Sequence, residues 1–491
     1  MRFKERIQNV TRGGWIRAGI WSTLYVLFVV WVAWQDWASL GWLVLLPLVA
    51  DAFSPTKIYS ETGGNDWGSL AWLLLLPLIL DAFTTKYINY SWWKKYKPED
   101  ANENENGKVK SNALLYTIFS WIDAIVFALV AVYFINLYVF QNYQIPSSSL
   151  EKTLRVGDFL FVSKMSYGAR VPNTPLSMPL VQHTFPEILG GGKSYIDQPH
   201  WNYKRLKGWD SPKKGDIVVF NFPTGDTVCT KMQNPDYYTL CYYYGEKMVK
   251  QRKDVFGDIV VRPVDRRENY VKRCVGEPGD SLKIVDNVIF TMENGKWEME
   301  NSKEGRQLNY IVHTDGHLLG SSYLEKIGIN KDDRQIIEPG IYHFPLTDAM
   351  ADELGKNPHI IAMDIEPEEH GGAVYPLGHN DWTRDNYGPI YIPRRGESLM
   401  ITEENYWLYK RIADAYEFKP MKIGEEYTFE MDYYWMMGDN RHNSADSRYW
   451  GFVPEDHIVG RPVFVWLSVE KDKEWFHGHI RWNRIGRGAE R

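Results

Sequence analysis

Apolar residues crowd the first 140 positions of the chain, and only short apolar stretches follow. Runs at about 18–34 and about 113–140 are long enough to cross a bilayer as helices. Beyond residue 141, short β-type segments lie between Gly, Pro, Asn and Asp. The pattern predicts N-terminal transmembrane helices followed by a mainly β domain. We place the strands of that domain at 216–222, 280–290, 388–392, 427–437 and 460–467.

An internal repeat lies inside the N-terminal region. The segments 36–53 and 66–83 match at 13 of 18 positions, which favours a local duplication of one membrane segment. Each copy is short for a full span, contains a proline and ends near an aspartate, so we expect its end near the lipid headgroups. The sequence predicts an anchor region over 1–112, which ends in a basic and polar linker, and a final transmembrane helix over 113–140.

Charge predicts the orientation of the anchor. Basic residues precede the first apolar run and recur at 86–110, so both segments are expected on the cytoplasmic side. The domain 141–491 is then extracytoplasmic. Two cytoplasmic segments require an even number of membrane crossings between them, but three apolar runs lie there. One repeat copy fails to cross, the pair forms one bent unit, or the N-terminus lies outside, and the sequence leaves these alternatives open.

Composition narrows the possible functions. The chain has 491 residues, enough for more than one domain, and its 21 Trp suit membrane-interface belts. The net charge of −6 gives no support for nucleic-acid binding. Cys229 and Cys241 are close enough to pair in an oxidising compartment, which would leave Cys274 over. Three free thiols fit the count equally well.

A serine cluster is the first candidate for chemistry. Ser147, Ser148 and Ser149 follow Pro146 and precede a short β-type run. Serine clusters are commonly solvated turns, so a base is needed to favour a hydrolase. No G-x-S-x-G elbow accompanies any histidine, and a surface or structural role is favoured for each one. The histidines weighed as bases are His183, His313, His370, His379, His442 and His457.

Lys272 is a better candidate base. It lies in a short β-type run, where alternation places Lys272 on one face and Arg273 on the other. A buried lysine has a lowered pKa and can take a proton from serine, whereas an ordinary edge-strand lysine cannot. The segment 438–460 is dense in hydrogen-bonding side chains and indicates a pinned loop beside a site. The glycine-rich segment 190–194 lacks the first glycine of a phosphate loop, because Glu187 occupies that position.

Together these stretches resemble bacterial type I signal peptidases. The resemblance rests on IPSSSLEKTL with GDFLFVSK, GDIVVFNFP at 215–223, YVKRCVGEPGD and GDNRHNSADSRYWG, which occur in the family's order and spacing. It covers 141–491 in outline, with IRWNRIG as a closing strand. It implies a signal-peptidase-like β fold with an inserted β subdomain. The long intervals 173–213, 224–265 and 295–430 are similar to the larger-insert versions of Gram-negative bacteria.

The resemblance implies a role for each matching residue. Ser149 would be the nucleophile and Lys272 the general base, with Ser147 and the backbone N–H of Ser149 forming the oxyanion hole. Ser444 would hydrogen-bond the lysine. The remaining implied residues are the supporting Asp446, Arg448 and Arg273 and the substrate-groove residues Tyr143, Gln144, Ile145, Tyr270 and Val271.

The implied enzyme is a hydrolase in the bacterial inner membrane, multi-pass, with its catalytic domain on the periplasmic side. It would remove N-terminal signal peptides from exported preproteins after small residues, in an Ala-x-Ala-like pattern. It would need no cofactor and no metal. Its partners would be preproteins, the lipid bilayer and, through functional contact, the export machinery, but no nucleic acid. The chain departs from the family at Leu150, commonly Met, and at Lys152, commonly Pro.

Two rival functions remain at this stage. One is a catalytically inactive relative that serves as a membrane binding or assembly module, against which the intact Ser149 and Lys272 argue. The other is a Ser-Lys protease that cleaves itself or a regulator, which would not need an anchor or a groove beside the bilayer.

Overall fold

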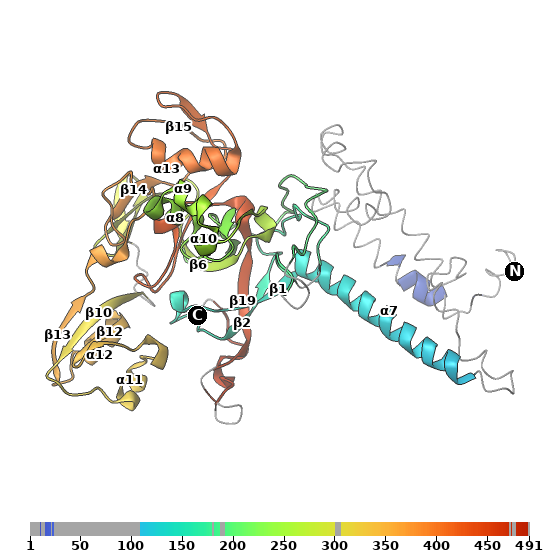
Figure 1. Cartoon of the computed structure of the whole chain (residues 1–491), viewed down its shortest axis with the longest axis horizontal. Coiled ribbons are helices and arrows are strands. Elements are labelled where there is room, and N and C mark those ends of the chain that lie inside the picture. The colour runs from blue at the N-terminus through green and yellow to red at the C-terminus, as the bar shows by residue number, and fades with distance from the viewer. Residues whose placement is uncertain are drawn as a thin grey trace. The chain divides into compact units, whose positions relative to one another are not determined.

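The computed structural model describes residues 10, 15–20, 22–23, 109–178, 181–186, 192–299, 306–470, 473 and 478–489. The repeat at 36–53 and 66–83 and most of the first apolar run therefore lie outside the described residues. Helix α7 (Val109–Tyr138) covers most of the last apolar run (Figure 1). Among the described residues, no helix is long and apolar enough to cross a membrane, so the predicted spans and the multi-pass topology are not confirmed.

The chain divides into two compact units. The first comprises 1–137, 175–181 and 196–207, and in it the Tyr133 hydroxyl donates to the Pro175 carbonyl at 2.7 Å. The second comprises 138–174, 182–195 and 208–491 and contains every strand described below.

A seven-stranded antiparallel sheet forms the centre of the second unit, in the order β1-β2-β19-β3-β6-β17-β18. Along β3, Ile217 and Val219 enter one hydrophobic core while Val218 and Phe220 enter another. Successive strand residues point to opposite faces, so a strand that is apolar throughout is buried on both. The strands are β1 (Phe140–Gln144), β2 (Asp158–Ser163), β3 (Ile217–Asn221), β6 (Asn269–Gly276), β17 (Tyr433–Met437), β18 (Val453–Pro454) and β19 (Ile458–Ser468).

A second sheet, of four strands in the order β14-β7-β8-β9, differs in one place from the sequence prediction. The stretch 280–290 is a hairpin, because Asp286 and Asn287 adopt positive φ angles of 47° and 64° and form a two-residue turn. The strand predicted at 427–437 is likewise interrupted, between β16 and β17. The strands of this sheet are β7 (Ser281–Val285), β8 (Val288–Glu293), β9 (Lys296–Met299) and β14 (Tyr387–Tyr391), and β15 (Ser398–Met400) and β16 (Glu426–Thr428) pair with each other as a separate two-stranded sheet.

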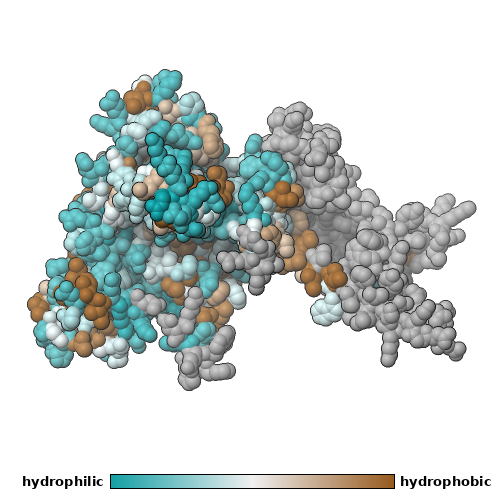
Figure 2. Space-filling view, viewed as in Figure 1, coloured by the Kyte–Doolittle hydropathy of each residue, from teal (hydrophilic) through white to brown (hydrophobic). Residues whose placement is uncertain are grey.

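A third sheet lies within the predicted interval 295–430, and we call it the insert sheet. Its order is β11-β12-β10-β13, and two helices pack on its core. Figure 2 shows apolar surface in this region, where Leu318, Ile336 and Ile361 are exposed. The elements are β10 (Gln307–Thr314), α11 (Ser321–Ile327), β11 (Gln335–Glu338), β12 (Ile341–Thr347), α12 (Asp348–Leu354) and β13 (Ile360–Ile365).

The interval 224–265 contains more helix than strand, because three short helices lie between β4 (Thr227–Cys229) and β5 (Ile259–Val261). The tyrosine-rich α8 begins after Asp236, whose carboxylate accepts from the N–H groups of Tyr238 and Thr239 and so caps the helix. This cap stabilises the start of the helix. All three cysteines are free thiols. The helices of this interval are α8 (Tyr237–Tyr244), α9 (Glu246–Gln251) and α10 (Lys253–Phe256), and a further helix, α13, spans Tyr406–Arg411.

Candidate active site

Ser149 lies in a 3₁₀ turn, Ser148–Leu150, between β1 and β2. Leu150 packs into a core with Ile145, which buries Ser149 as well. The Oγ atoms of Ser147 and Ser149 are 3.5 Å apart. The Ser148 hydroxyl instead accepts a hydrogen bond of 3.1 Å from Asn443. The turn therefore gives three consecutive serines different surroundings and buries Ser149.

Lys272 lies on β6, opposite Val218 of β3, and is 5% exposed. Burial lowers the pKa of its amine to about 8, the nearby Asp446 and Asp439 oppose this shift, and Arg448 adds to it. Two anions thus act on the lysine, but burial outweighs them. Roughly a tenth of such an amine is neutral at pH 7, far more than for an ordinary lysine.

The segment 438–446, which we call the GDN loop, joins the two candidates. The Asn440 N–H donates to the Ser149 carbonyl at 3.0 Å. Just before the loop, Met437 of β17 pairs with Arg273, the neighbour of Lys272 on β6. Ser149 and Lys272, which are far apart in sequence, therefore adjoin the same loop.

Gly438 allows this close approach. A Cβ at this position would lie 2.3 Å from Ser444 Oγ and 2.9 Å from the Ser149 carbonyl oxygen. Contacts this short are excluded for any side chain, so the position requires glycine.

Ser444 is buried, and its Oγ has no hydrogen-bond partner among the described residues. Among the described residues, Lys272 forms no hydrogen bond or ion pair. The hydrogen bond predicted between Ser444 and Lys272 is therefore not formed in this structure. No hydrogen bond joins Ser149 to Lys272 within the described residues either. Catalytic hydrogen bonds are commonly long without substrate and tighten when it binds.

Asp446 and Arg448 form a buried ion pair. Arg448 Nε and Nη2 donate to the two carboxylate oxygens at 2.9 and 2.8 Å, and the Gly438 N–H donates to Oδ2 at 3.2 Å. Burial opposes ionisation, but the charge and hydrogen bonds of Arg448 outweigh it and lower the pKa of Asp446. Asp446 also accepts from the N–H of Arg448 and so caps α14 (Ser447–Trp450). The pair fixes the end of the GDN loop.

Arg273 fixes the beginning of the loop. Its Nε and Nη2 donate to the two oxygens of Asp439, each at 2.7 Å. Thr153, which follows the serine turn, also donates to Asp439 at 3.1 Å. Asp439 therefore joins β6, the GDN loop and the serine turn, and sequence reasoning did not single it out. Its place between Gly438 and Asn440, within the motif GDNRHNSADSRYWG, was the available signal.

The predicted groove residues lie on two strands. Tyr143 and Gln144 belong to β1, an edge strand that pairs with β2. On β6, Tyr270 and Val271 pair with β3 on one side, and no described strand pairs with their other side, because pairing with β17 starts at Arg273.

Ile145, the fifth predicted groove residue, is 3% exposed and packs in the core against which Val271 also rests. It is therefore a buried residue at the start of the serine turn.

Neither of the two buried histidines that the sequence placed near Asp446 contacts Ser149 among the described residues. The His442 ring lies 3.1 Å from Asn287 and from Asp385, and burial lowers its pKa. Burial also lowers the pKa of His457 to about 4, and its ring lies against Asp456. Both are held in structural hydrogen bonds, as the sequence predicted.

Comparison with known proteins places the chain in a class. The model of the family "Signal peptidase, peptidase S26" matches residues 118–317 and 393–467, and the chain belongs to this family. Most of the insert sheet lies in the gap between the two matched segments.

Individual relatives carry the name "Signal peptidase I". One from Buchnera aphidicola subsp. Acyrthosiphon pisum is 26% identical over 390 residues, 79% of this chain and 84% of the relative. One from Haemophilus influenzae is 27% identical over 352 residues, 71% of this chain and 69% of the relative. One from Helicobacter pylori is 25% identical over 362 residues, 71% and 81% of the two chains. The predicted relationship to bacterial type I signal peptidases is confirmed.

Proposed function

We propose that the chain is a membrane-bound serine endopeptidase that removes N-terminal signal peptides from exported preproteins with a Ser149–Lys272 dyad. Family membership and the names of the relatives support the reaction class. The observation that carries the dyad is the buried amine of Lys272, whose pKa is lowered to about 8. An amine of this kind can be neutral at physiological pH and serve as a base.

The chemistry runs through an acyl-enzyme. Neutral Lys272 takes the proton of the Ser149 hydroxyl, and Oγ attacks the carbonyl carbon of the residue before the scissile bond. The Ser147 hydroxyl and the Ser149 N–H donate to the oxyanion, a contribution of about 3 kcal/mol per donor in other hydrolases. Protonated Lys272 then gives its proton to the leaving amine, and the peptide bond breaks. Neutral Lys272 activates water, which hydrolyses the ester and restores Ser149.

The GDN loop holds these groups in position. When substrate binds, the Ser444 hydroxyl donates a hydrogen bond to the Lys272 amine. This bond gives the buried Ser444 Oγ the partner that it otherwise lacks among the described residues. Asp446 and Arg448 keep the loop against Ser149, and Arg273 does the same through Asp439. Each of these residues acts through others and does not touch the substrate.

The substrate adds to the sheet as an extended strand. The open side of β6 at Tyr270 and Val271 offers backbone groups for pairing, and Tyr143 and Gln144 on the edge strand β1 line the other wall. Val271 is only partly buried against the core that contains Ile145, and a shallow apolar subsite at Val271 would favour cleavage after an Ala-x-Ala-like sequence.

Anchoring in the inner membrane completes the proposal. The sequence at 113–140 is strongly apolar, and Trp121 and Phe127 of α7 are 67% and 75% exposed. If the apolar segment 113–140 anchors the chain in the bilayer, as the sequence predicts, enzyme and signal peptide share one membrane, which raises their effective concentration. The same arrangement brings the enzyme beside the export machinery.

The test is cleavage of a preprotein with an Ala-x-Ala site by the detergent-purified chain. Ser149→Ala and Lys272→Met are expected to lose at least about 10³-fold in kcat/KM. Matched controls are Ser148→Ala, the adjacent serine, and Lys213→Met, an exposed lysine before β3, which we expect to stay within about threefold of the wild type.

Each failure has its own meaning. Full activity of Lys272→Met would refute the lysine as base while leaving a serine peptidase. An intact preprotein with the wild-type enzyme would refute the peptidase and favour the binding module.

A further inference from the structure

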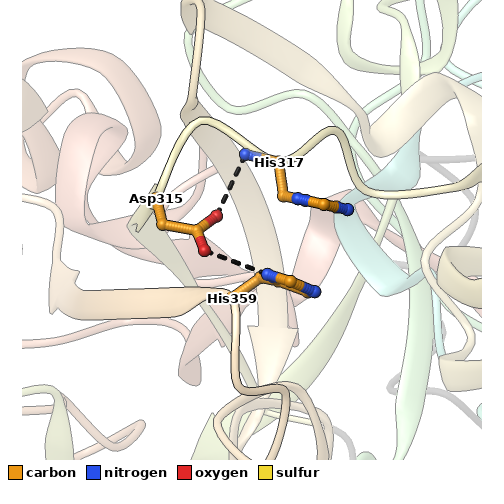
Figure 3. A group of neighbouring side chains, drawn as sticks. All are labelled: Asp315, His317 and His359. Atoms are coloured by element: carbon orange, nitrogen blue, oxygen red, sulfur yellow. Dashed lines mark hydrogen bonds and ion pairs between the residues drawn. The ribbon is translucent and has the colours of Figure 1, made fainter.

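We propose that Asp315, His317 and His359 form a binding site for one divalent transition-metal ion, with zinc as the best fit. One ligand atom from each residue lies within 4.8 Å of the other two. The three side chains lie together at one end of the insert sheet (Figure 3). This sheet does not carry Ser149 or Lys272, so the site is separate from the proposed dyad.

The backbone fixes the two segments that supply these side chains. Asp315 and His317 follow β10, and His359 precedes β13, which pairs with β10. The Asp315 N–H donates to the His359 carbonyl at 3.1 Å, and the His359 N–H donates to the Asn357 side chain at 3.0 Å. The segments therefore hold their positions without a metal.

The side chains already interact in a way that gathers the donor atoms. Asp315 Oδ2 lies 3.0 Å from His359 Nδ1, and Oδ1 accepts from the His317 N–H at 3.0 Å. The two imidazole rings are stacked, with centroids 3.8 Å apart and planes 10° apart. In Figure 3 both rings lie beside the carboxylate.

Metal binding requires only side-chain rotation. Metal–ligand distances of about 2.0–2.1 Å in a tetrahedral site bring ligand atoms to about 3.4 Å from one another. The stacked rings would open slightly so that both nitrogens point to the ion. Asp315 and His359 are 46% and 40% exposed, so these rotations displace no core packing.

The donor set indicates the kind of ion. Two imidazole nitrogens and one carboxylate oxygen suit zinc and its neighbours in the transition series, whereas magnesium and calcium prefer oxygen alone. Three protein ligands leave a fourth position to water or to a side chain from another molecule.

The experiment is isothermal titration calorimetry. ZnCl₂ is titrated into the 491-residue chain in detergent after treatment with a chelator and dialysis. We expect one site with a dissociation constant of about 10 μM or tighter. Asp315→Asn keeps the acceptor for the His317 N–H, and His317→Ala keeps that N–H itself, so neither variant removes the backbone contacts. Each is expected to weaken zinc binding at least about tenfold.

The matched control is His183→Ala, because His183 also contacts a carboxylate, that of Glu268, at 3.0 Å. It should bind zinc as the wild type does. No binding at about 100 μM zinc, or equal binding by Asp315→Asn and His317→Ala, would overturn the site. Tighter binding of magnesium than of zinc would also overturn it. The readout is independent of peptidase activity.

Discussion

Glu151 Oε1 accepts a hydrogen bond of 2.7 Å from Asn330 Nδ2, which joins the serine turn to the segment between α11 and β11. The next residue, Lys152, donates to the Gly328 carbonyl at 2.9 Å. The resemblance to the family implies proline at position 152, and here the lysine side chain contacts the inserted region. The insert is therefore attached directly to the segment that carries Ser149.

Glu151 makes the stability of this attachment pH-dependent. Burial, with the nearby Asp333, raises the pKa of its carboxyl to about 7. The folded chain then binds more protons than the unfolded chain between about pH 4.5 and 7, so this group's stabilising contribution falls as pH rises through that window. Glu151→Gln is expected to be more stable than the wild type by about 1–3 kcal/mol at pH 8 and nearly equal at pH 5. Denaturant unfolding at both pH values measures this, and an equal difference at both would contradict it.

The lowered pKa of Lys272 predicts how the rate of cleavage depends on pH. With the neutral amine as the proposed base and its pKa lowered to about 8, kcat/KM should rise nearly tenfold per pH unit from pH 6 and level off above about 8. Steady-state rates on a preprotein between pH 6 and 9.5 give the profile. Ser148→Ala should follow the same curve. A flat profile between pH 6 and 8 would mean that another group is the base.

Lys272→Met should lose activity and gain stability. The lowered pKa means that the unfolded chain binds more protons than the folded chain between about pH 8 and 10.5, so the wild type is destabilised at and below pH 8. A methionine of similar length removes this ionisation, and we expect a gain of about 1–3 kcal/mol at pH 7 that shrinks as pH approaches 10. Thermal or denaturant unfolding tests it. A destabilised variant would instead indicate that the amine has a partner which stabilises the fold.

The Arg273–Asp439 pair should contribute more to the free energy of unfolding than an exposed ion pair does. Removing Arg273 leaves a buried carboxylate without its partner, so Arg273→Met is expected to lower the free energy of unfolding by about 2–4 kcal/mol. The double variant Arg273→Met/Asp439→Leu should recover part of that loss. Arg394→Met, which removes an exposed pair with Glu397, is the control and should change stability by less than about 1 kcal/mol. Equal losses at Arg273 and Arg394 would contradict the bridging role of Asp439.

The sequence predicted the elements better than the contacts between them. Strands such as β3 and β19 follow from short apolar segments between turn residues, and Ser149 and Lys272 follow from motif resemblance. The hairpin turn at Asp286 and Asn287 was missed because the apolar residues continue on both sides of it. The bonds from Asn440 to Ser149 and from Asp439 to Arg273 join residues far apart in sequence, and no local pattern encodes them.

The proposed metal site likewise depends on contacts between residues far apart in sequence. Asp315 and His317 are neighbours in sequence, but His359 joins them only because β10 pairs with β13. No spacing rule connects the third residue to the first two, so the sequence alone does not indicate the proposed site.

The point where the insert sheet joins the GDN loop, which we call its root, determines where the sheet could be exchanged for that of a relative. The Gln307 N–H donates to the Asp439 carbonyl at 2.8 Å, and the Arg441 N–H donates to the Gln307 carbonyl at 2.9 Å, so β10 begins as a neighbour of the GDN loop. One step further, Tyr310 and Ile365 face each other where the chain leaves and returns. A hybrid that replaces the sheet should therefore be joined at Tyr310 and Ile365, which keeps the contacts of Gln307 native, and it should retain Gly328 and Asn330, which contact Lys152 and Glu151.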